Sequence, residues 1–486
     1  MWGLAAFIGR IRGSGCLMAA LLAGCNPLSA DLTNGPVASH LRRQAIPMAL
    51  GLIALISFDA VDLFFVAQLG DAPLAAISFT FPVIWLLSSI VIGFEAGAAS
   101  CISRAVGSND IPGARRQTTD TVLLAGIVSI ALCFIGLATI KPLFLLLGAT
   151  DDLLPQIDDY MSIWYWSAPL SAMTWTCLAA IRARGNSLLE GKIIVLAAVI
   201  NAILDPLLIF GMFGFPRLEI AGAALATVIA NVTVLTGTLI YLHVSLRVFA
   251  TPFTAMANIL NSWKDMLQIG LPAILTNAIV PLSNGIILAM VASYGISAVA
   301  GYGIAVRIEP FALIAFYALS AVTSPFMGQN VAAGKHERLE DARIRIGRFC
   351  LLFGLCLWVL MSFLVEPLSG LFSDSEVIRA VAIDYIRITG IGFGAYGMVM
   401  ASCAAFNGIG RPLPGVAVSV LRAMVILMPM VYIGKALMGL NGIFIAAALA
   451  NIFTGVLGYV WLGRQIASLA DKHASAQSAV TRSGGL

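Results

Sequence analysis

The chain contains long, nearly uninterrupted runs of apolar residues, and the length of these runs limits what it can fold into. A helix needs about 20 apolar residues to cross a bilayer, whereas barrel strands are shorter and alternate polar with apolar residues. The runs therefore predict an all-α polytopic membrane protein with twelve transmembrane helices. The predicted spans cover residues 44–69, 74–103, 118–146, 158–181, 193–214, 219–245, 266–292, 297–328, 346–370, 380–405, 413–437 and 440–463.

Composition supports this prediction and excludes several classes of protein. Hydrophobic residues make up 60% of the 486 positions, charged residues only 11%, and the mean hydropathy is +0.95, so a water-soluble fold would expose too much apolar surface. The eight cysteines lack metal-ligand spacing, and the sequence contains no Walker A, GxSxG, HExxH or nucleotide-binding motif. We therefore expect no enzyme, no cofactor and no nucleic-acid partner.

The distribution of charge predicts the topology. Most of the 28 Lys and Arg residues fall before the first span or in the loops on that side of the membrane. The opposite loops are acidic. Because cytoplasmic loops carry the excess of basic residues, we expect a multi-pass protein of the inner (plasma) membrane. An even number of spans places both termini in the cytoplasm.

An internal repeat divides the chain into two halves. Residues 47–76 align without gaps with residues 272–301, and residues 222–242 align with residues 442–462. Six spans in each half make the repeats parallel, an arrangement common in secondary transporters, whose halves rock around a central cavity. The predicted organisation is an N-terminal extension, disordered or cytoplasmic, then an N-lobe, a cytoplasmic linker, a C-lobe and a cytoplasmic tail. These parts cover residues 1–41, 42–250, 251–264, 265–465 and 466–486.

Two aspartates inside predicted spans are the strongest candidates for function. Asp62 lies in the first span and Asp205 in the fifth, where a charge costs several kcal/mol and usually marks an ion or proton pathway. Asp59 lies one turn before Asp62, and two acids this close cannot both stay ionised easily. With Asn201 and Thr227 they predict an all-oxygen site for H⁺ or Na⁺. The alternative is that these groups only hydrogen-bond neighbouring helices together.

Several further residues carry weaker predictions. Glu95 is either a second proton site or an interhelical hydrogen-bonding group, and Arg307 with Glu309 is either a structural pair or part of a cavity rim. Aromatic residues of the fourth span form either an interfacial belt or a stacking wall for a cationic substrate. The candidate substrate-cavity residues are Tyr160, Tyr165, Asn284 and Tyr396.

Several motifs together resemble a known family. Pro47 precedes Asp62 by fifteen residues, the fifth span reads Asn-x3-Asp-Pro, and the sixth contains GAALAT at residues 222–227. With the run SAVTSPFMGQNVAAGK at residues 320–335, the chain resembles the multidrug and toxic compound extrusion (MATE) family over about residues 42–465. The resemblance implies export of organic, often cationic, compounds in exchange for H⁺ or Na⁺ through two lobes. It places Asp62, Asn201, Asp205 and Thr227 on the cation site, and Pro47 at the bending point of the first span.

Two departures from the family pattern refine the expectation. The seventh and tenth spans contain no acid over residues 270–287 and 390–408, which points to the DNA-damage-inducible-F-like branch, and Asp59 stands where an amide is more usual. We favour H⁺ over Na⁺ as the coupling ion. The expected partners are small organic substrates and the lipid bilayer, with the protein acting as a monomer. The alternatives are a lipid or lipid-linked oligosaccharide flippase of the same superfamily and, from another class, a membrane-embedded enzyme or channel.

Overall fold

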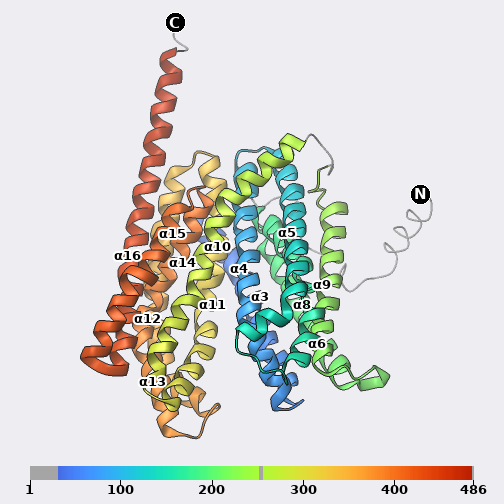
Figure 1. Ribbon diagram of the computed structural model, residues 1–486. Coiled ribbons are helices and arrows are strands. Elements are labelled where there is room, and N and C mark those ends of the chain that lie inside the picture. Colours follow the sequence, from blue (N-terminus) through green and yellow to red (C-terminus); the bar gives the residue numbers. More distant parts are fainter. Residues whose placement is uncertain (1–30, 251–255, 484–486) are drawn as a thin grey trace, which may run out of the picture.

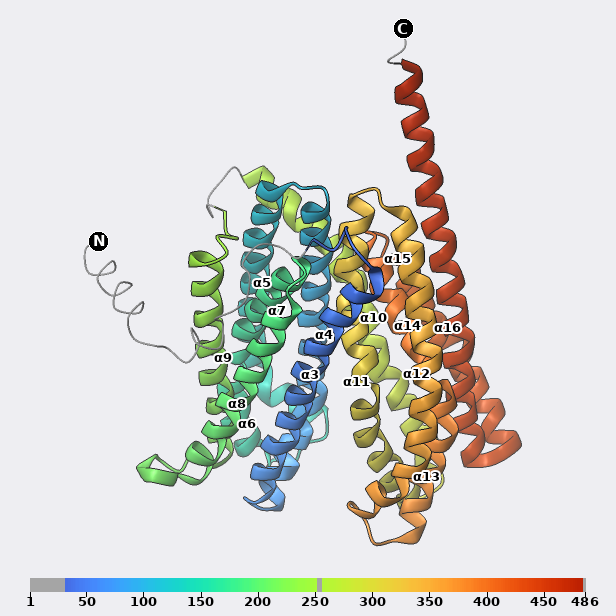
Figure 2. The ribbon, with the colours of Figure 1, turned by 180° about the vertical axis from the view of Figure 1, so that it is seen from behind.

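The structure is a computed structural model that describes residues 31–250 and 256–483. These residues form helices and contain no strand. The helices gather into two bundles that lie side by side, and the two views in Figures 1 and 2 agree on this division. The all-α prediction is therefore confirmed for the part of the chain that the structure describes.

The helices follow the order of the predicted spans. The N-lobe contains α3 (Val37–Ala67), α4 (Asp71–Gly107), α5 (Ile111–Leu146), α6 (Leu154–Trp164), α7 (Ser167–Ala183), α8 (Ser187–Phe210), η1 (Met212–Gly214) and α9 (Glu219–Val244). The C-lobe contains α10 (Met256–Ala292), α11 (Ile296–Ala332), α12 (His336–Gly370), α13 (Glu376–Thr389), η2 (Gly390–Gly392), α14 (Phe393–Gly408), α15 (Leu413–Val420), η3 (Leu421–Leu427) and α16 (Met428–Ser483).

Ten helical stretches of the described residues are long and apolar enough to cross a membrane. The fourth predicted span is divided between α6 and α7 at Tyr165 and Trp166, so neither piece reaches that length. The last stretch, Leu413–Ser475, holds two predicted spans joined at Gly439, whose φ of 62° and ψ of −136° interrupt the helix. The observed helices are thus consistent with twelve passes.

Matching turns in the two lobes agree with the predicted repeat. Gly70 ends the first turn of the N-lobe with a φ of 117°, and Gly295, at the aligned position, has a φ of 98°. Gly185 and Gly410 have φ values of 80° and 75° in the short turns before α8 and α15. These positive φ angles favour glycine, so the same backbone turns recur in both halves.

The lobes meet at the end of the molecule that the charge pattern predicts to be cytoplasmic. Helix α4 packs along α10 and α11, and a Cβ atom on Gly97 would lie 2.7 Å from Met266 O. At this end Ser100 Oγ donates a hydrogen bond to Asn407 O at 2.5 Å, and Gln329 Nε2 donates to Ala183 O at 2.7 Å. Small residues thus allow close helix contact, and hydrogen bonds reinforce it.

The N-terminal turn joins the same contact region. Leu32 N donates to Gln329 Oε1 at 3.0 Å, and Arg338 Nη2 donates to Leu32 O at 2.9 Å. Lys335 Nζ donates to Thr33 O at 2.8 Å. Residues 31–35 therefore tie the beginning of the N-lobe to α11 and α12 of the C-lobe.

Candidate functional site

The predicted cation site assembles on the facing surfaces of α8 and α9. Asn201 and Asp205 lie one turn apart on α8 and are buried, at 3% and 0% exposure. With its amide oriented to satisfy both neighbours, Asn201 donates through Nδ2 to Asp205 Oδ1 at 2.9 Å and Oδ2 at 3.1 Å, and accepts from Thr227 Oγ1 at 3.2 Å. Gly222 permits this approach, because a Cβ atom there would lie 2.5 Å from Leu208 O.

Helix α3 brings Asp62 to this cluster. Helix α3 packs along α8, and a Cβ atom on Gly191 of α8 would lie only 2.5 Å from Pro47 O. The charge of Asp62 acts on Asp205 and on the buried hydroxyl of Tyr160 from α6. The structure therefore gathers residues that lie far apart in the sequence. Tyr160, predicted as a cavity residue, is a neighbour of the carboxylates.

Asp62 has a carboxylate oxygen that the surrounding protein leaves unsatisfied. Its Oδ1 atom is buried and has no hydrogen-bond partner among the described residues. A buried polar atom without a partner costs about 1 to 3 kcal/mol, and more when it is charged. A proton or Na⁺ bound between Asp62 and Asp205 would remove that cost and the repulsion between the two carboxylates. The oxygens of this cluster suit either ion.

Asp59 lies outside the buried part of the cluster. Its side chain is exposed, whereas Asp62 is half-buried, although the charge of Asp62 acts on it. The predicted proximity of the two acids is therefore present, but they occupy different environments. Helix α3 continues as a helix through Pro47, so its role as a bending point stays a prediction.

Glu95 belongs to a separate network of buried charges. Its carboxylate pairs with Arg182, and Arg182 also pairs with Glu190. Arg182 and Glu190 are 2% and 0% exposed, so this network joins α4, α7 and α8 inside the N-lobe. The geometry favours the interhelical interaction over an independent proton site for Glu95.

The remaining predicted cavity residues are dispersed. Tyr165 is 1% exposed and lies in the core of the N-lobe, where a Cβ atom on Gly136 would meet its ring. Asn284 is exposed on α10, and Tyr396 is half-buried on α14. The structure thus brings only Tyr160 of this set to the predicted cation site.

Arg307 and Glu309 do not form the expected pair. None of the ion pairs among the described residues joins them. Glu309 instead accepts a hydrogen bond from Tyr385 Oη at 3.0 Å, and the charge of Arg422 reaches it. Arg422 was not predicted as a functional residue, although it is a charge inside the predicted span 413–437.

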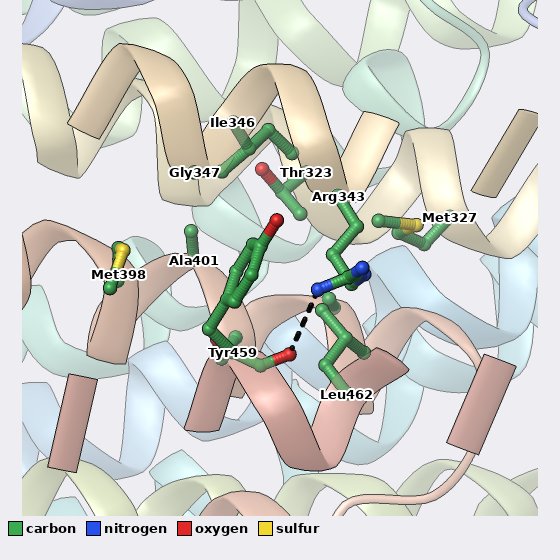
Figure 3. A pocket seen from close by; sticks show the side chains of 11 residues that line it. Thr323, Met327, Arg343, Ile346, Gly347, Met398, Ala401, Tyr459 and Leu462 are labelled. Atoms are coloured by element: carbon green, nitrogen blue, oxygen red, sulfur yellow. Dashed lines mark hydrogen bonds between the residues drawn. The ribbon is translucent and has the colours of Figure 1, made fainter. Parts of the chain in front are cut away.

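The described residues also line hollows away from these clusters, and two of them bear on substrate binding. One, shown in Figure 3, lies among α11, α12, α14 and α16, where the Arg343 guanidinium lies 4.2 Å from the centre of the Tyr459 ring. Its volume of about 10 Å³ suffices for roughly one water. The other is an apolar groove of about 400 Å³ between α3 of the N-lobe and α11 and α12 of the C-lobe, lined by residues that include Ile53 and Phe311. Of these two hollows, the groove is the one large enough for an organic molecule.

Comparisons with known proteins agree with the fold and the repeat. The MatE family model matches residues 47–207 and again residues 272–433, so each match begins at one of the two prolines aligned by the repeat. The chain is 36% identical to a protein of Shewanella oneidensis named FAD transporter, over 88% of this chain and 95% of that protein. It is 25% identical to the multidrug export protein MepA of Staphylococcus aureus, over 86% and 91%.

Solved structures show the same architecture. The Vibrio cholerae MATE transporter VcmN, solved in a bent form, superposes with a TM-score of 0.84 at 29% identity, covering 89% of this chain and 97% of that one. An outward-facing MATE family transporter superposes with a TM-score of 0.85 at 23% identity, covering 91% and 99%. At 23% identity, the similarity to this outward-facing transporter shows the fold alone.

Proposed function

The chain belongs to the MatE family of transporters, and on this basis we propose that it exports organic compounds in exchange for H⁺ or Na⁺ by alternating access of its two lobes. The observation that carries the proposal is the unsatisfied Asp62 Oδ1 beside the buried pair of Asn201 and Asp205. Such a group within a membrane-spanning bundle marks an ion pathway more often than a structural contact.

The coupling follows from the charges of the N-lobe cluster. Without a bound cation, Asp62 and Asp205 repel each other and Asp62 Oδ1 lacks a partner among the described residues. A cation at this position lowers the free energy of the arrangement that brings α3 against α8. A ligand shifts a conformational equilibrium only by its difference in affinity between the two states. A change in the distance between these carboxylates would give the cation such a difference in affinity.

The contact between the lobes supports alternating access. The hydrogen bonds from Ser100 and Gln329, together with the close approach at Gly97, hold the lobes together at the predicted cytoplasmic end. Rocking of one lobe against the other would have to break these contacts. The apolar groove between α3 and α11 offers a surface between the lobes for the organic part of a substrate.

Two classes of substrate follow from different observations. The acidic N-lobe cluster favours a cationic or amphipathic compound, as the relative named multidrug export protein MepA suggests. The relative at 36% identity is named FAD transporter and is covered over 95% of its length, which favours a flavin dinucleotide. We propose H⁺ as the coupling ion, with Na⁺ as the alternative.

Reconstituted vesicles test the proposal. Purified protein in proteoliposomes, given an imposed pH gradient in sodium-free buffer, should move a fluorescent organic cation or FAD against its concentration gradient and dissipate the pH gradient in the same step. A response that requires added Na⁺ would make Na⁺ the coupling ion in place of H⁺. Absence of gradient-driven movement of either compound with either ion would overturn the proposal.

A further inference from the structure

The C-lobe holds a half-buried cation in an aromatic site that the coupling mechanism does not use. Arg422 lies on η3, within a stretch that reads as membrane-spanning. Its Nη1 atom donates to Asn451 Oδ1 at 3.2 Å, and its guanidinium lies 5.0 Å from the centre of the Tyr396 ring. Its Nε atom is buried and has no hydrogen-bond partner in the described part of the chain. The guanidinium therefore retains unused donor capacity.

Glu309 does not neutralise the charge of Arg422. The charge of Arg422 reaches Glu309, but none of the ion pairs found in residues 31–250 and 256–483 joins the two side chains. Glu309 is bound instead by Tyr385 Oη at 3.0 Å. Tyr302 packs edge-on against Tyr385 at 5.3 Å, and its own hydroxyl is buried without a partner among these residues. The site therefore has polar groups that its protein neighbours do not satisfy.

The backbone at Arg422 is also unusual. Leu421–Leu427 is π-helical, a local form that is rare and concentrates at functional sites. Helix η3 contacts α10, the C-lobe helix that packs along α4 of the N-lobe. Arg422 and Tyr396 are half-buried rather than sealed in the core, so the site lies beside the interface between the lobes and retains an accessible face.

The repeat gives the two lobes opposite polarity at related positions. At the offset of 220 that aligns residues 222–242 with residues 442–462, Arg422 corresponds to Ala202, the neighbour of Asn201, and Asn451 corresponds to Asn231. At the same offset Asp205 corresponds to Val425, so the N-lobe carboxylate and the C-lobe guanidinium lie in corresponding segments, three residues apart along the chain. A cation such as H⁺ or Na⁺ suits the first site and cannot suit the second.

We propose that Arg422, with Asn451 and Tyr396, binds the phosphate group of an aromatic phosphate ester that the protein exports. This rests on the proposed export function. A guanidinium offers a planar set of donors that matches phosphate oxygens, and its Nε–H is one of these donors. The amide of Asn451 adds hydrogen-bonding capacity, and the half-buried ring of Tyr396 offers an aromatic surface to a ligand ring system.

Binding of matched flavins tests this site without a gradient. Full-length protein is reconstituted in neutral phosphatidylcholine vesicles, and equilibrium binding of riboflavin and of flavin mononucleotide, which differ by one phosphate, is measured for the wild type and for Arg422→Gln. The wild type should bind the phosphate ester at least about tenfold more tightly, and Arg422→Gln should lose most of that preference while its riboflavin affinity changes little. Arg422→Lys should keep part of it, because the charge remains without the planar donors.

Controls separate this proposal from folding and from the export function. Arg348→Gln removes an exposed arginine of α12 in the same lobe and should leave the preference unchanged. Retained transport of an organic cation by Arg422→Gln shows that the variant is folded. If the wild type itself binds both flavins equally, the proposal fails whatever the variants do. Loss of the preference on adding anionic phosphatidylglycerol would instead assign the site to lipid phosphate and overturn the proposal, whereas failure of gradient-driven movement alone concerns the export function.

Discussion

Asn201 and Asp205 lie one turn apart on α8, and the Asn201 amide donates to both carboxylate oxygens, at 2.9 Å and 3.1 Å, while accepting from Thr227 at 3.2 Å. The amide fixes the position of one carboxylate of the proposed cation site and joins α8 to α9. It leaves the second carboxylate, Asp62 on α3, to approach a preformed partner. The position of Asp205 is therefore fixed by its hydrogen bonds, whereas the position of Asp62 depends on how α3 lies against α8.

Removing this amide should weaken binding of the coupling ion without abolishing transport. We expect Asn201→Ala to raise the cation concentration needed for half-maximal exchange by about tenfold, since a hydrogen bond to a charged group contributes roughly 1.5 to 3 kcal/mol. Asn231→Ala, on the same helix as Thr227, is the matched control and should change the value little. The measurement is exchange in proteoliposomes over a range of cation concentrations. Equal values for both variants would contradict the assignment.

The buried charges around Arg182 should support stability and not coupling. Breaking a buried ion pair by removing one partner costs about 3 to 5 kcal/mol, so Arg182→Gln should strongly lower the melting temperature in detergent. The exposed pair of Arg345 and Asp341 gives the comparison, because Arg345→Gln should cost about 0 to 1 kcal/mol. Glu95→Gln should retain ion-coupled exchange. Loss of coupling in folded Glu95→Gln would instead make Glu95 the second proton site.

The close contact at Gly97 should set the balance between the two orientations of the lobes. A side chain at this position would meet Met266 O, so Gly97→Val should open the predicted cytoplasmic end and slow transport. Gly285→Val is the control, because a Cβ atom on Gly285 meets nothing within 4 Å. Labelling of a single cysteine placed at Asn407 reports the opening. Unchanged labelling in Gly97→Val would show that the lobes do not part there.

The N-terminal turn should depend on Asp31. Burial raises the pKa of Asp31, but hydrogen bonds from Thr33 and Asn34 and the charge of Lys335 outweigh it, so the pKa lies below its ordinary value. A lowered pKa means that the ionised form stabilises the turn above the unfolded value of about 3.9 and that this contribution is lost as the pH falls through the folded value. Asp31→Asn should therefore speed hydrogen exchange of the Leu32 and Thr33 amides at neutral pH. Wild-type exchange rates in that variant would contradict this role.

The sequence predicted one part of the geometry of the proposed cation site better than another. The spacing of Asn201 and Asp205 placed them on one helix face, because four residues make about one helical turn, and the structure confirms it. The approach of Asp62 depends on packing between α3 and α8, which the helical period does not encode. Asp59 shows the limit: spacing placed it near Asp62, but only the neighbouring helices decide that it is exposed.

The parts that escaped prediction depend on contacts between distant segments. Arg422 was visible as a charge within a span, yet its partners Tyr396 and Asn451 come from two other helices. The network of Glu95, Arg182 and Glu190 likewise joins three helices, so its members read singly as unrelated charges. Some helix ends were also not predicted. The fourth predicted span, for example, divides between α6 and α7.

We propose that Asp62 and Asp205 carry the coupling cation. The most direct measurement compares Asp62→Asn, Asp205→Asn and the exposed Asp59→Asn for gradient-driven export and for substrate-induced release of a preformed pH gradient in sodium-free proteoliposomes. We expect the first two variants to be folded in the membrane and inactive, and Asp59→Asn to retain transport. Gradient-driven transport that persists in both Asp62→Asn and Asp205→Asn would contradict the account.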